Sequence, residues 1–463
     1  MGAKRIKKRL KRTKRPLRSK PLLSLAMMVK NEEEFLEDAL KSAQPFCDEL
    51  IVVDTGSTDR TVEIARDLGA KVSFFEWCNN FSKARNETLK RATGQWVAIL
   101  DADERFQGQK PESIRQFLKP GPSFPFQALM VNVVNTRLDG SPISSFFSVR
   151  FFPNHPRLGY SGRVHNRFGA LGHNPPKVEA TRYLGLEIVH LGYDPALYKA
   201  RQKAARSLPL IEATVREEPS NHQQRFYLGR EYLLLNRIDD AVAALTLAFE
   251  GIEATGAGPL ADTATHLMQA LARNQAHDDV LKVGQRALAH APNHPDIWFE
   301  FGQALMHCGD LSTAAEAYEK ALAGLSAMGS EAQTRLIHHR WKAHEMLGLA
   351  YFKTQQYQAS YTAYLRALDG KPEGTDGWPV LLNSVCALGI ELGDDARVPI
   401  LLDRLLRRAD TPLAMFFFQL KRVVQRTGQD AGRTMLLEAI QVCPRITEDP
   451  EYHQWAHLIG HSP

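Results

Sequence analysis

Cysteine is scarce in this chain of 463 residues, and long apolar runs are absent. No run approaches the roughly 20 apolar residues that a membrane-spanning helix needs, and no apolar segment follows the basic N-terminus as a signal peptide requires. The cysteines are odd in number, scattered and never spaced as C-x-x-C, which argues against a disulfide framework and a zinc site. They are Cys47, Cys78, Cys308, Cys386 and Cys443. We therefore expect a protein that is not exported and that resides in a reducing compartment.

The glycine-rich motifs G-x-x-x-x-G-K-S/T and G-x-G-x-x-G are also missing, so neither a P-loop nor a dinucleotide-binding fold is supported. Apolar residues make up 44% of the chain and charged residues 24%. These values are ordinary for a globular protein and exclude collagen-like, mucin-like and wholly disordered chains.

The net charge of +6 comes from one end of the chain. Residues 1–20 contain eleven of the 58 Lys and Arg residues and no acid, so 47 bases face 52 acids in the remainder. We interpret residues 1–20 as a basic disordered arm. Such an arm can bind an anionic membrane surface, nucleic acid or an acidic partner, or it can be a solvated tail. We expect a cytoplasmic protein, with peripheral attachment at the inner membrane face as an alternative, and no nucleic-acid partner.

The sequence between residues 21 and 195 alternates apolar strands with helices and predicts an α/β domain. Such alternation is typical of a mostly parallel sheet whose ligands bind at the carboxyl ends of the strands. The predicted strands are residues 23–29, 49–53, 71–75 and 96–100, and the predicted helices are residues 32–42, 58–68 and 81–92. Beyond residue 103 we expect strands at 150–152 and 188–193.

From residue 222 onward the sequence is helical throughout, and a 34-residue period begins at positions 222, 261, 295 and 341. This pattern resembles the tetratricopeptide repeat, a helix-turn-helix unit that stacks into a solenoid. We assign residues 222–374 to these repeats, 196–221 to a helical connector and 375–463 to further helices that cap the solenoid. Such solenoids commonly bind polypeptides, although self-association or a spacer role would also explain one.

Two groups of carboxylates follow predicted strands. Asp54 comes directly after the strand at 49–53 and precedes a tight turn in which Ser57 or Thr58 can cap the next helix. Capping does not explain Asp54, which could accept hydrogen bonds from a nucleobase or a ribose. Asp101 and Asp103 follow the strand at 96–100 and would share one face if that strand continued. They could then hold Mg²⁺ or Mn²⁺, which commonly bridges carboxylates to substrate phosphates.

Four ordered motifs resemble family 2 glycosyltransferases of the GT-A fold. They are MMVKNEE at 27–33, IVVDTGSTDRT at 51–61, FSKARN at 81–86 and LDADE at 100–104. With the repeats behind them, the chain is similar to the bacterial subgroup that includes peptide S-glycosyltransferases. The resemblance covers about residues 24–193. It implies an inverting hexosyl transfer from a nucleotide-diphosphate sugar, with a UDP-sugar favoured.

The resemblance also implies roles for individual residues. Asp54 would hold the base or ribose, and the metal and diphosphate would be bound by Asp101 and Asp103. His190 would be a further metal ligand or diphosphate contact, or else a hydrogen-bonded core histidine. The other residues expected beside the donor are Asn31, Glu32, Ser57, Arg85 and Asn86.

An inverting transfer needs a base for the acceptor's proton and a cation for the leaving diphosphate. Glu104 and His165 are the candidate bases, ahead of Asp139 and Asp194. Glu104 could instead be an acid at a helix start, favoured there by the helix dipole. The subgroup commonly has V-H-E where this chain has Val-His-Asn166, so a glutamate role does not carry over. If the acceptor is a cysteine thiol, partial ionisation near neutral pH makes a strong base less important.

We therefore expect a metal-dependent glycosyltransferase whose repeats hold a peptide or protein acceptor. One alternative is a binding scaffold with a degenerate transferase domain, and another is a transferase for a glycan or lipid-linked acceptor. The carboxylates Asp54, Asp101 and Asp103 favour an enzyme, because neighbouring carboxylates repel one another without a cation.

Overall fold

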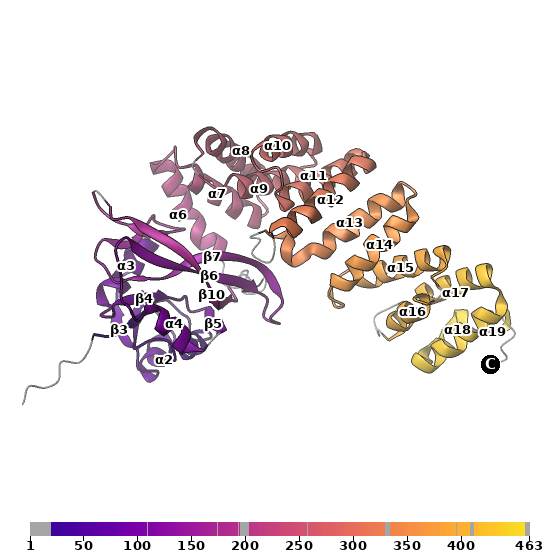
Figure 1. Ribbon diagram of the computed structural model, residues 1–463, viewed down its shortest axis with the longest axis horizontal. Helices are drawn as coiled ribbons and strands as arrows, with labels where there is room; N and C mark the ends of the chain where they lie inside the picture. The colour runs from indigo at the N-terminus through magenta and orange to yellow at the C-terminus, as the bar shows by residue number, and fades with distance from the viewer. Residues whose placement is uncertain are drawn as a thin grey trace, which may run out of the picture. The chain divides into compact units, whose positions relative to one another are not determined.

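The computed structural model describes residues 20–108, 110–173, 175–192, 194, 203–256, 258–328, 334–394, 396–407 and 412–458. The chain forms two compact units (Figure 1). The first contains residues 1–141 and 146–197, and the second contains residues 142–145 and 198–463. Residues 1–19 of the expected basic arm lie outside the described residues. Among the described helices, none combines the length and apolar character that crossing a membrane requires.

The first half of the sheet in the N-terminal unit confirms the predicted alternation. Four strands run parallel in the order β3-β2-β1-β4, and the three inner ones are buried almost throughout because helices cover both faces. The strands are β1 (Leu23–Val29), β2 (Glu49–Asp54), β3 (Lys71–Phe74) and β4 (Trp96–Ile99). The helices between them are α1 (Leu36–Ala43), α2 (Thr61–Asp67) and α3 (Phe81–Arg91). Helices α1 and α2 begin four and three residues later than predicted.

The second half of the sheet is mixed, and it brings later parts of the sequence to the end of β4. Strand β7 pairs antiparallel with β4, while β10 runs parallel to β6 and antiparallel to β5. The elements are β5 (Glu104–Gly108), α4 (Pro111–Leu118), β6 (Phe126–Thr136), β7 (Pro142–Pro153) and β10 (Val178–His190). A separate antiparallel pair is formed by β8 (Leu158–Ser161) and β9 (Arg167–Ala170). The predicted strand at 150–152 lies within β7, whereas β10 ends at His190 instead of residue 193.

The second unit is a helical solenoid, as the 34-residue period predicts. Its repeats pair α7 (His222–Leu234) with α8 (Ile238–Thr255), α9 (Leu260–Arg273) with α10 (His277–His290), α11 (Pro295–Cys308) with α12 (Leu311–Met328), and α13 (Arg340–Lys353) with α14 (Tyr357–Gly370). Glycines let the paired helices approach: a Cβ added to Gly302 would lie 2.8 Å from Tyr318 Cε1, and one added to Gly348 would lie 2.5 Å from Tyr364 Cδ1. Helix α6 (Lys203–Glu217) falls in the predicted connector and packs on α7, where Tyr232 Oη donates to Glu212 at 3.0 Å.

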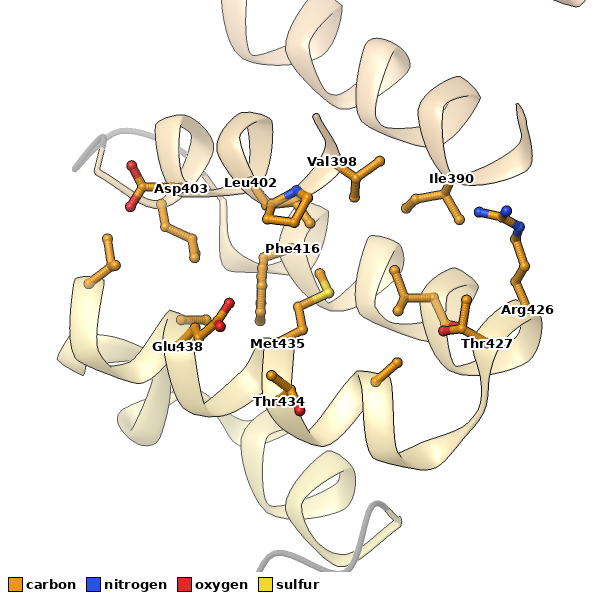
Figure 2. Close-up of a pocket in the computed structure, with 16 residues that line it drawn as sticks. Ile390, Val398, Leu402, Asp403, Phe416, Arg426, Thr427, Thr434, Met435 and Glu438 are labelled. Atoms are coloured by element: carbon orange, nitrogen blue, oxygen red, sulfur yellow. The ribbon is translucent and has the colours of Figure 1, made fainter. Parts of the chain in front are cut away.

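Further helices continue the solenoid beyond residue 375. They are α15 (Trp378–Leu392), α16 (Val398–Leu406), α17 (Leu413–Thr427), α18 (Gln429–Val442) and α19 (Pro450–Leu458), with a 3-10 turn, η3 (Pro444–Glu448), before α19. Their core is continuous with the last repeat through Tyr361 and Tyr364. A cavity of about 540 Å³ lies among α15 to α18, with apolar walls around Phe416 and Met435 and with Asp403, Glu438 and Arg426 among its polar lining residues (Figure 2).

Candidate active site

The loops that follow β1 and β2 are joined by hydrogen bonds. The backbone N–H of Asn31 donates to Ser57 Oγ at 2.9 Å, and Asn31 Oδ1 accepts from the N–H of Thr58 at 2.8 Å. The N–H of Glu32 donates to Thr61 Oγ1 at 2.7 Å. This network occupies residues that the sequence pattern assigned to the first turns of α1 and α2, which is why those helices start late. Asn31, Glu32 and Ser57 therefore shape the rim at the carboxyl ends of the strands.

Asp54 stands at the end of β2 with only 2% of its surface exposed. Its Oδ2 accepts from the backbone N–H groups of Gly56 at 2.9 Å and Ser57 at 3.0 Å. Gly56 has φ of +106°, a conformation that residues with a Cβ rarely adopt. The carboxylate thus orders the turn that follows β2.

The D-x-D sequence forms a turn, so the expectation that a continuing strand would put both aspartates on one face is not met. Strand β4 ends at Ile99 and β5 begins at Glu104. Glu104 donates its N–H to Asp101 O at 3.0 Å, and the N–H of Asp101 donates to Glu104 Oε2 at 2.9 Å. These reciprocal bonds close the turn, and the two aspartates contact different partners.

Asp101 pairs with an arginine from the FSKARN motif. Arg85 Nη2 donates to Asp101 Oδ1 at 2.8 Å, and its guanidinium carbon lies 5.1 Å from the centre of the Tyr160 ring. Burial raises the pKa of the Asp101 carboxyl, but the Arg85 and Arg150 guanidinium groups lower it by more, so the net shift is downward. Burial likewise opposes the charge of Arg85, yet Asp101 raises the Arg85 pKa overall. Both groups are therefore charged at neutral pH.

Glu104 uses both of its carboxylate oxygens in an ion pair with an arginine of β7. Arg150 Nη1 donates to Glu104 Oε2 at 2.8 Å, and Nη2 donates to Oε1 at 2.6 Å. Only 8% of the Arg150 side chain and 2% of the Glu104 side chain are exposed. Both carboxylate oxygens of Glu104 therefore accept charged hydrogen bonds, and Oε2 also accepts the backbone N–H of Asp101. This geometry does not favour Glu104 as the base, and because Glu104 opens a strand, the helix-start alternative does not apply either.

Asp103 lies close to His190, the last residue of β10. The β5–β10 register pairs His190 with Glu104, and His190 Nε2 lies 3.5 Å from Asp103 Oδ1. The other ring nitrogen, Nδ1, is 2.8 Å from Asn135 Oδ1 on β6. An amide oxygen there favours the tautomer with the proton on Nδ1, which leaves the Nε2 lone pair directed away from Asn135.

The donor set fits a divalent cation that keeps other ligands. Within the described ranges, no group of three or more His, Cys, Asp or Glu side chains could hold a metal by itself. Asp103 and His190 offer an oxygen and a nitrogen close together, whereas Asp101 Oδ1 is paired with Arg85. Mg²⁺ and Mn²⁺ commonly take one or two protein ligands and complete their shell with water and substrate phosphate. The pair suits that mode of binding.

Asn86 and His165 belong to a contact between α3 and the β8–β9 hairpin. Asn86 Nδ2 donates to Tyr160 O and its Oδ1 accepts from Tyr160 N, both at 2.8 Å. The N–H of Phe81 donates to Arg163 O at 2.8 Å, which ties the start of α3 to the turn that carries His165. His165 has φ of +45°. The amide of Asn86 thus positions the hairpin, and α3 positions the turn.

The remaining candidate bases have local backbone partners. Asp139 lies in the turn between β6 and β7, where its Oδ1 accepts from Ser141 N at 2.8 Å. Asp194 is buried, and its Oδ2 accepts from Leu138 N at 3.0 Å.

Two residues that the sequence analysis did not select contribute to this site. Arg150 neutralises Glu104, and Asn135 contacts His190. Each is a polar residue beside apolar ones in its strand, Asn135 after Val133 and Val134 and Arg150 between Val149 and Phe151. Only strand pairing shows which partner each one has.

Comparisons with known proteins identify two regions. Residues 24–176 match the family model described as glycosyl transferase family 2. Residues 268–328 match a tetratricopeptide repeat model.

Several curated relatives match part of the chain. A TPR repeat-containing protein of Synechococcus elongatus is 32% identical over 203 residues, which cover 43% of this chain and 49% of that protein. The SPbeta prophage-derived glycosyltransferase SunS of Bacillus subtilis is 27% identical over 224 residues, which cover 48% and 52%. An uncharacterized glycosyltransferase of Rickettsia bellii is 38% identical over 93 residues, which cover 20% and 31%. The chain thus spans about half the length of the first two relatives.

Proposed function

Because the chain carries a family 2 glycosyltransferase domain followed by tetratricopeptide repeats, we propose that it transfers a sugar from a nucleotide-diphosphate sugar to a peptide or protein side chain. The observation that carries this proposal is the arrangement after β4, a parallel strand, where Asp101 and Asp103 follow the carboxyl end and are contacted by Arg85 of α3 and His190 of β10. Ligands of open α/β sheets bind at that edge. The similarity to a relative named as a glycosyltransferase supports the same activity.

Asp103 and His190 would hold the metal, and Asp54 would accept hydrogen bonds from the base or ribose. Mn²⁺ or Mg²⁺ bound there would neutralise the charge that develops on the leaving diphosphate. Asp101 fixes the Arg85 guanidinium beside the same turn, where it can contact the diphosphate oxygens. We favour a UDP-sugar as donor and an inverting transfer, in which the acceptor attacks the anomeric carbon opposite the leaving group.

For the acceptor's proton, we propose His165 as the base, ahead of Glu104, Asp139 and Asp194. Glu104 is saturated by Arg150 and the N–H of Asp101, and we assign it the role of holding the D-x-D turn. Asn86 has the same kind of role for the β8–β9 hairpin. A cysteine thiol acceptor would need His165 less than a hydroxyl acceptor, because a thiol ionises more readily.

The repeats support a polypeptide acceptor, because stacked helix pairs present extended surfaces that bind peptides. We propose a cytoplasmic location for this reaction. A glycan or a lipid-linked sugar is the alternative acceptor, and for a lipid-linked one the basic residues 1–20 supply positive charge that can bind an anionic membrane. A scaffold with an inactive transferase domain is the remaining alternative.

Release of nucleoside diphosphate from a panel of UDP- and GDP-sugars, with Mn²⁺ or Mg²⁺ and without acceptor, tests the proposal. Transferases commonly hydrolyse their donor slowly, so we expect metal-dependent release from one donor that is lost in Asp103→Asn. Asp67→Asn, at an exposed position on α2, is the matched control and should behave as the wild type. If no donor is hydrolysed and no nucleotide binds with metal, the scaffold becomes the better account.

A further inference from the structure

A groove of about 930 Å³ lies in the last complete repeats of the solenoid. Helices α12, α13 and α14 form its walls, and both charged and apolar side chains line it. Its charged and polar lining includes Arg340 and His344 on α13, Arg366 on α14, and Glu319 on α12. Leu322 and Leu347 supply apolar surface. A volume of this size holds several residues of an extended peptide or one small ligand.

Arg340 and Arg366 are exposed, and within the part of the chain that the structure describes neither forms an ion pair. Glu319, the carboxylate among the described lining residues, and Glu345 on α13 are both bonded to other groups. Glu345 binds Lys371 at 3.1 Å, and Glu319 accepts a hydrogen bond from the Tyr351 hydroxyl. Among the described lining residues, the groove therefore contains two guanidinium groups and a single carboxylate, Glu319, which is already bonded.

Other arginines of the solenoid differ in this respect. Arg404 on α16 pairs with Glu373 at 2.9 Å, and Arg422 on α17 pairs with Glu391 at 2.6 Å. Arg286 likewise pairs with Glu253 across neighbouring helices. Cross-helix ion pairs thus occur elsewhere in the solenoid, whereas Arg340 and Arg366 line one groove without an ion pair among the described residues.

His344 also lines the groove, and the positive charge of both arginines affects its pKa. Burial and the positive charges of Arg366 and Arg340 lower its pKa to about 4. Its Nδ1 is buried and, among the described residues, has no hydrogen-bond partner. At neutral pH the imidazole is therefore uncharged and adds no further repulsion. The groove therefore carries positive charge, and one polar atom at its wall, His344 Nδ1, has no hydrogen-bond partner among the described residues.

We propose that this groove binds a carboxylate of an acidic peptide segment, held between Arg340 and Arg366. This proposal rests on the proposed function, because the bound peptide would be part of the acceptor polypeptide. Guanidinium groups bind carboxylates through paired charged hydrogen bonds, which supplies the charge complement that the groove lacks. Leu322 and Leu347 would contact apolar side chains next to the acidic residue. The repeats would thereby select acceptors that carry acidic residues near apolar ones.

The test uses the full chain and two fluorescent synthetic peptides of the same length. One contains Asp and Leu in alternation between Gly residues, and the other replaces each Asp by Asn. We expect the acidic peptide to bind, its affinity to fall as salt increases, and the Asn peptide to bind much more weakly. Equal binding of the two peptides overturns the proposal without recourse to any variant.

Arg340→Gln and Arg366→Gln test the residues themselves. Each should weaken binding of the acidic peptide about tenfold, because a charged hydrogen bond contributes roughly that factor. Arg433→Gln, at an exposed position on α18 outside the groove, is the matched control and should bind as the wild type does. Wild-type affinity in the double variant overturns the assignment. Inorganic phosphate binding at the groove without binding of the acidic peptide would overturn the carboxylate assignment as well.

Donor hydrolysis by the wild type separates this inference from the proposed function. Hydrolysis without binding of the acidic peptide would reject the groove as a peptide site and leave the transferase intact. Binding of the peptide without hydrolysis of any donor would reject the transferase and keep the groove.

Discussion

Arg150 and Glu104 form a two-point ion pair, with Nη1–Oε2 and Nη2–Oε1 distances of 2.8 and 2.6 Å, in a nearly water-free part of the N-terminal unit. Glu104 also accepts the N–H of Asp101. One buried pair therefore fixes the turn that carries both aspartates. The stability of this unit and the shape of the candidate site therefore depend on the same ion pair, because Glu104, the buried carboxylate, also closes the turn.

Removing either partner should destabilise the protein strongly. Glu104→Gln or Arg150→Met leaves an uncompensated buried charge, and we expect a loss of about 3–5 kcal/mol in the free energy of unfolding of the N-terminal unit. Urea denaturation measures this loss. Lys90→Met breaks an exposed pair with Glu87 and should cost about 1 kcal/mol or less. A loss as small as that of the control would show that the pair is not desolvated.

Asn135→Ala should reduce metal affinity without removing a ligand. Its amide fixes the orientation of the His190 ring, and loss of such a partner typically weakens metal binding about 10- to 100-fold. Titration of nucleoside diphosphate release with Mn²⁺ should show a higher half-saturating concentration. Asn132→Ala, on the same strand but bonded to Glu187, should leave that concentration unchanged. An equal shift in both variants would contradict the orienting role.

Glu49 should make stability depend on acid pH. Burial opposes its charge, but hydrogen bonds from Lys71, Ser24 and Thr93 outweigh burial and lower its pKa to about 2. Since the pKa in the unfolded chain is about 4.3, the ionised group stabilises the fold fully above that pH. The stabilisation is lost as pH falls toward 2.

Unfolding of wild type and Glu49→Gln across pH 2 to 6 tests this dependence. The difference between the two proteins should be largest near pH 6 and shrink toward pH 2. Glu63→Gln removes an exposed carboxylate of α2 and should show no such trend. A difference that is constant with pH would exclude the lowered pKa of Glu49.

Gly348→Ala should destabilise the solenoid. The added Cβ would lie 2.5 Å from Tyr364 Cδ1, and Tyr364 is itself buried, so either the ring or the helix pair must shift. Overpacking of this kind costs about 1–3 kcal/mol. Gly374→Ala, where the Cβ would meet nothing within 4 Å, is the control. Thermal unfolding followed by circular dichroism distinguishes the two, and equal melting temperatures would contradict close packing at Gly348.

The sequence predicted the parts of the fold that depend on local periodicity. Strands β1 to β4 and the repeat helices follow from apolar runs and from a 34-residue period, because each element must bury its own apolar face. Asp54 and the D-x-D residues were also recognisable, since polar residues directly after buried strands lie at the edge where ligands bind. The late starts of α1 and α2 were not predictable, because side chains of two separate loops compete there with helical hydrogen bonds.

By itself the sequence determined the order of elements, the two-part organisation and the identity of the charged residues. Only the tertiary structure decided which charges meet. Arg150 reaches Glu104 across 46 positions, and His190 reaches Asp103 through the antiparallel pairing of β10 with β5. Strand pairing between distant segments depends on the register of the whole sheet, which no local pattern encodes. That register made Glu104 a buried structural partner and gave His190 the position beside Asp103.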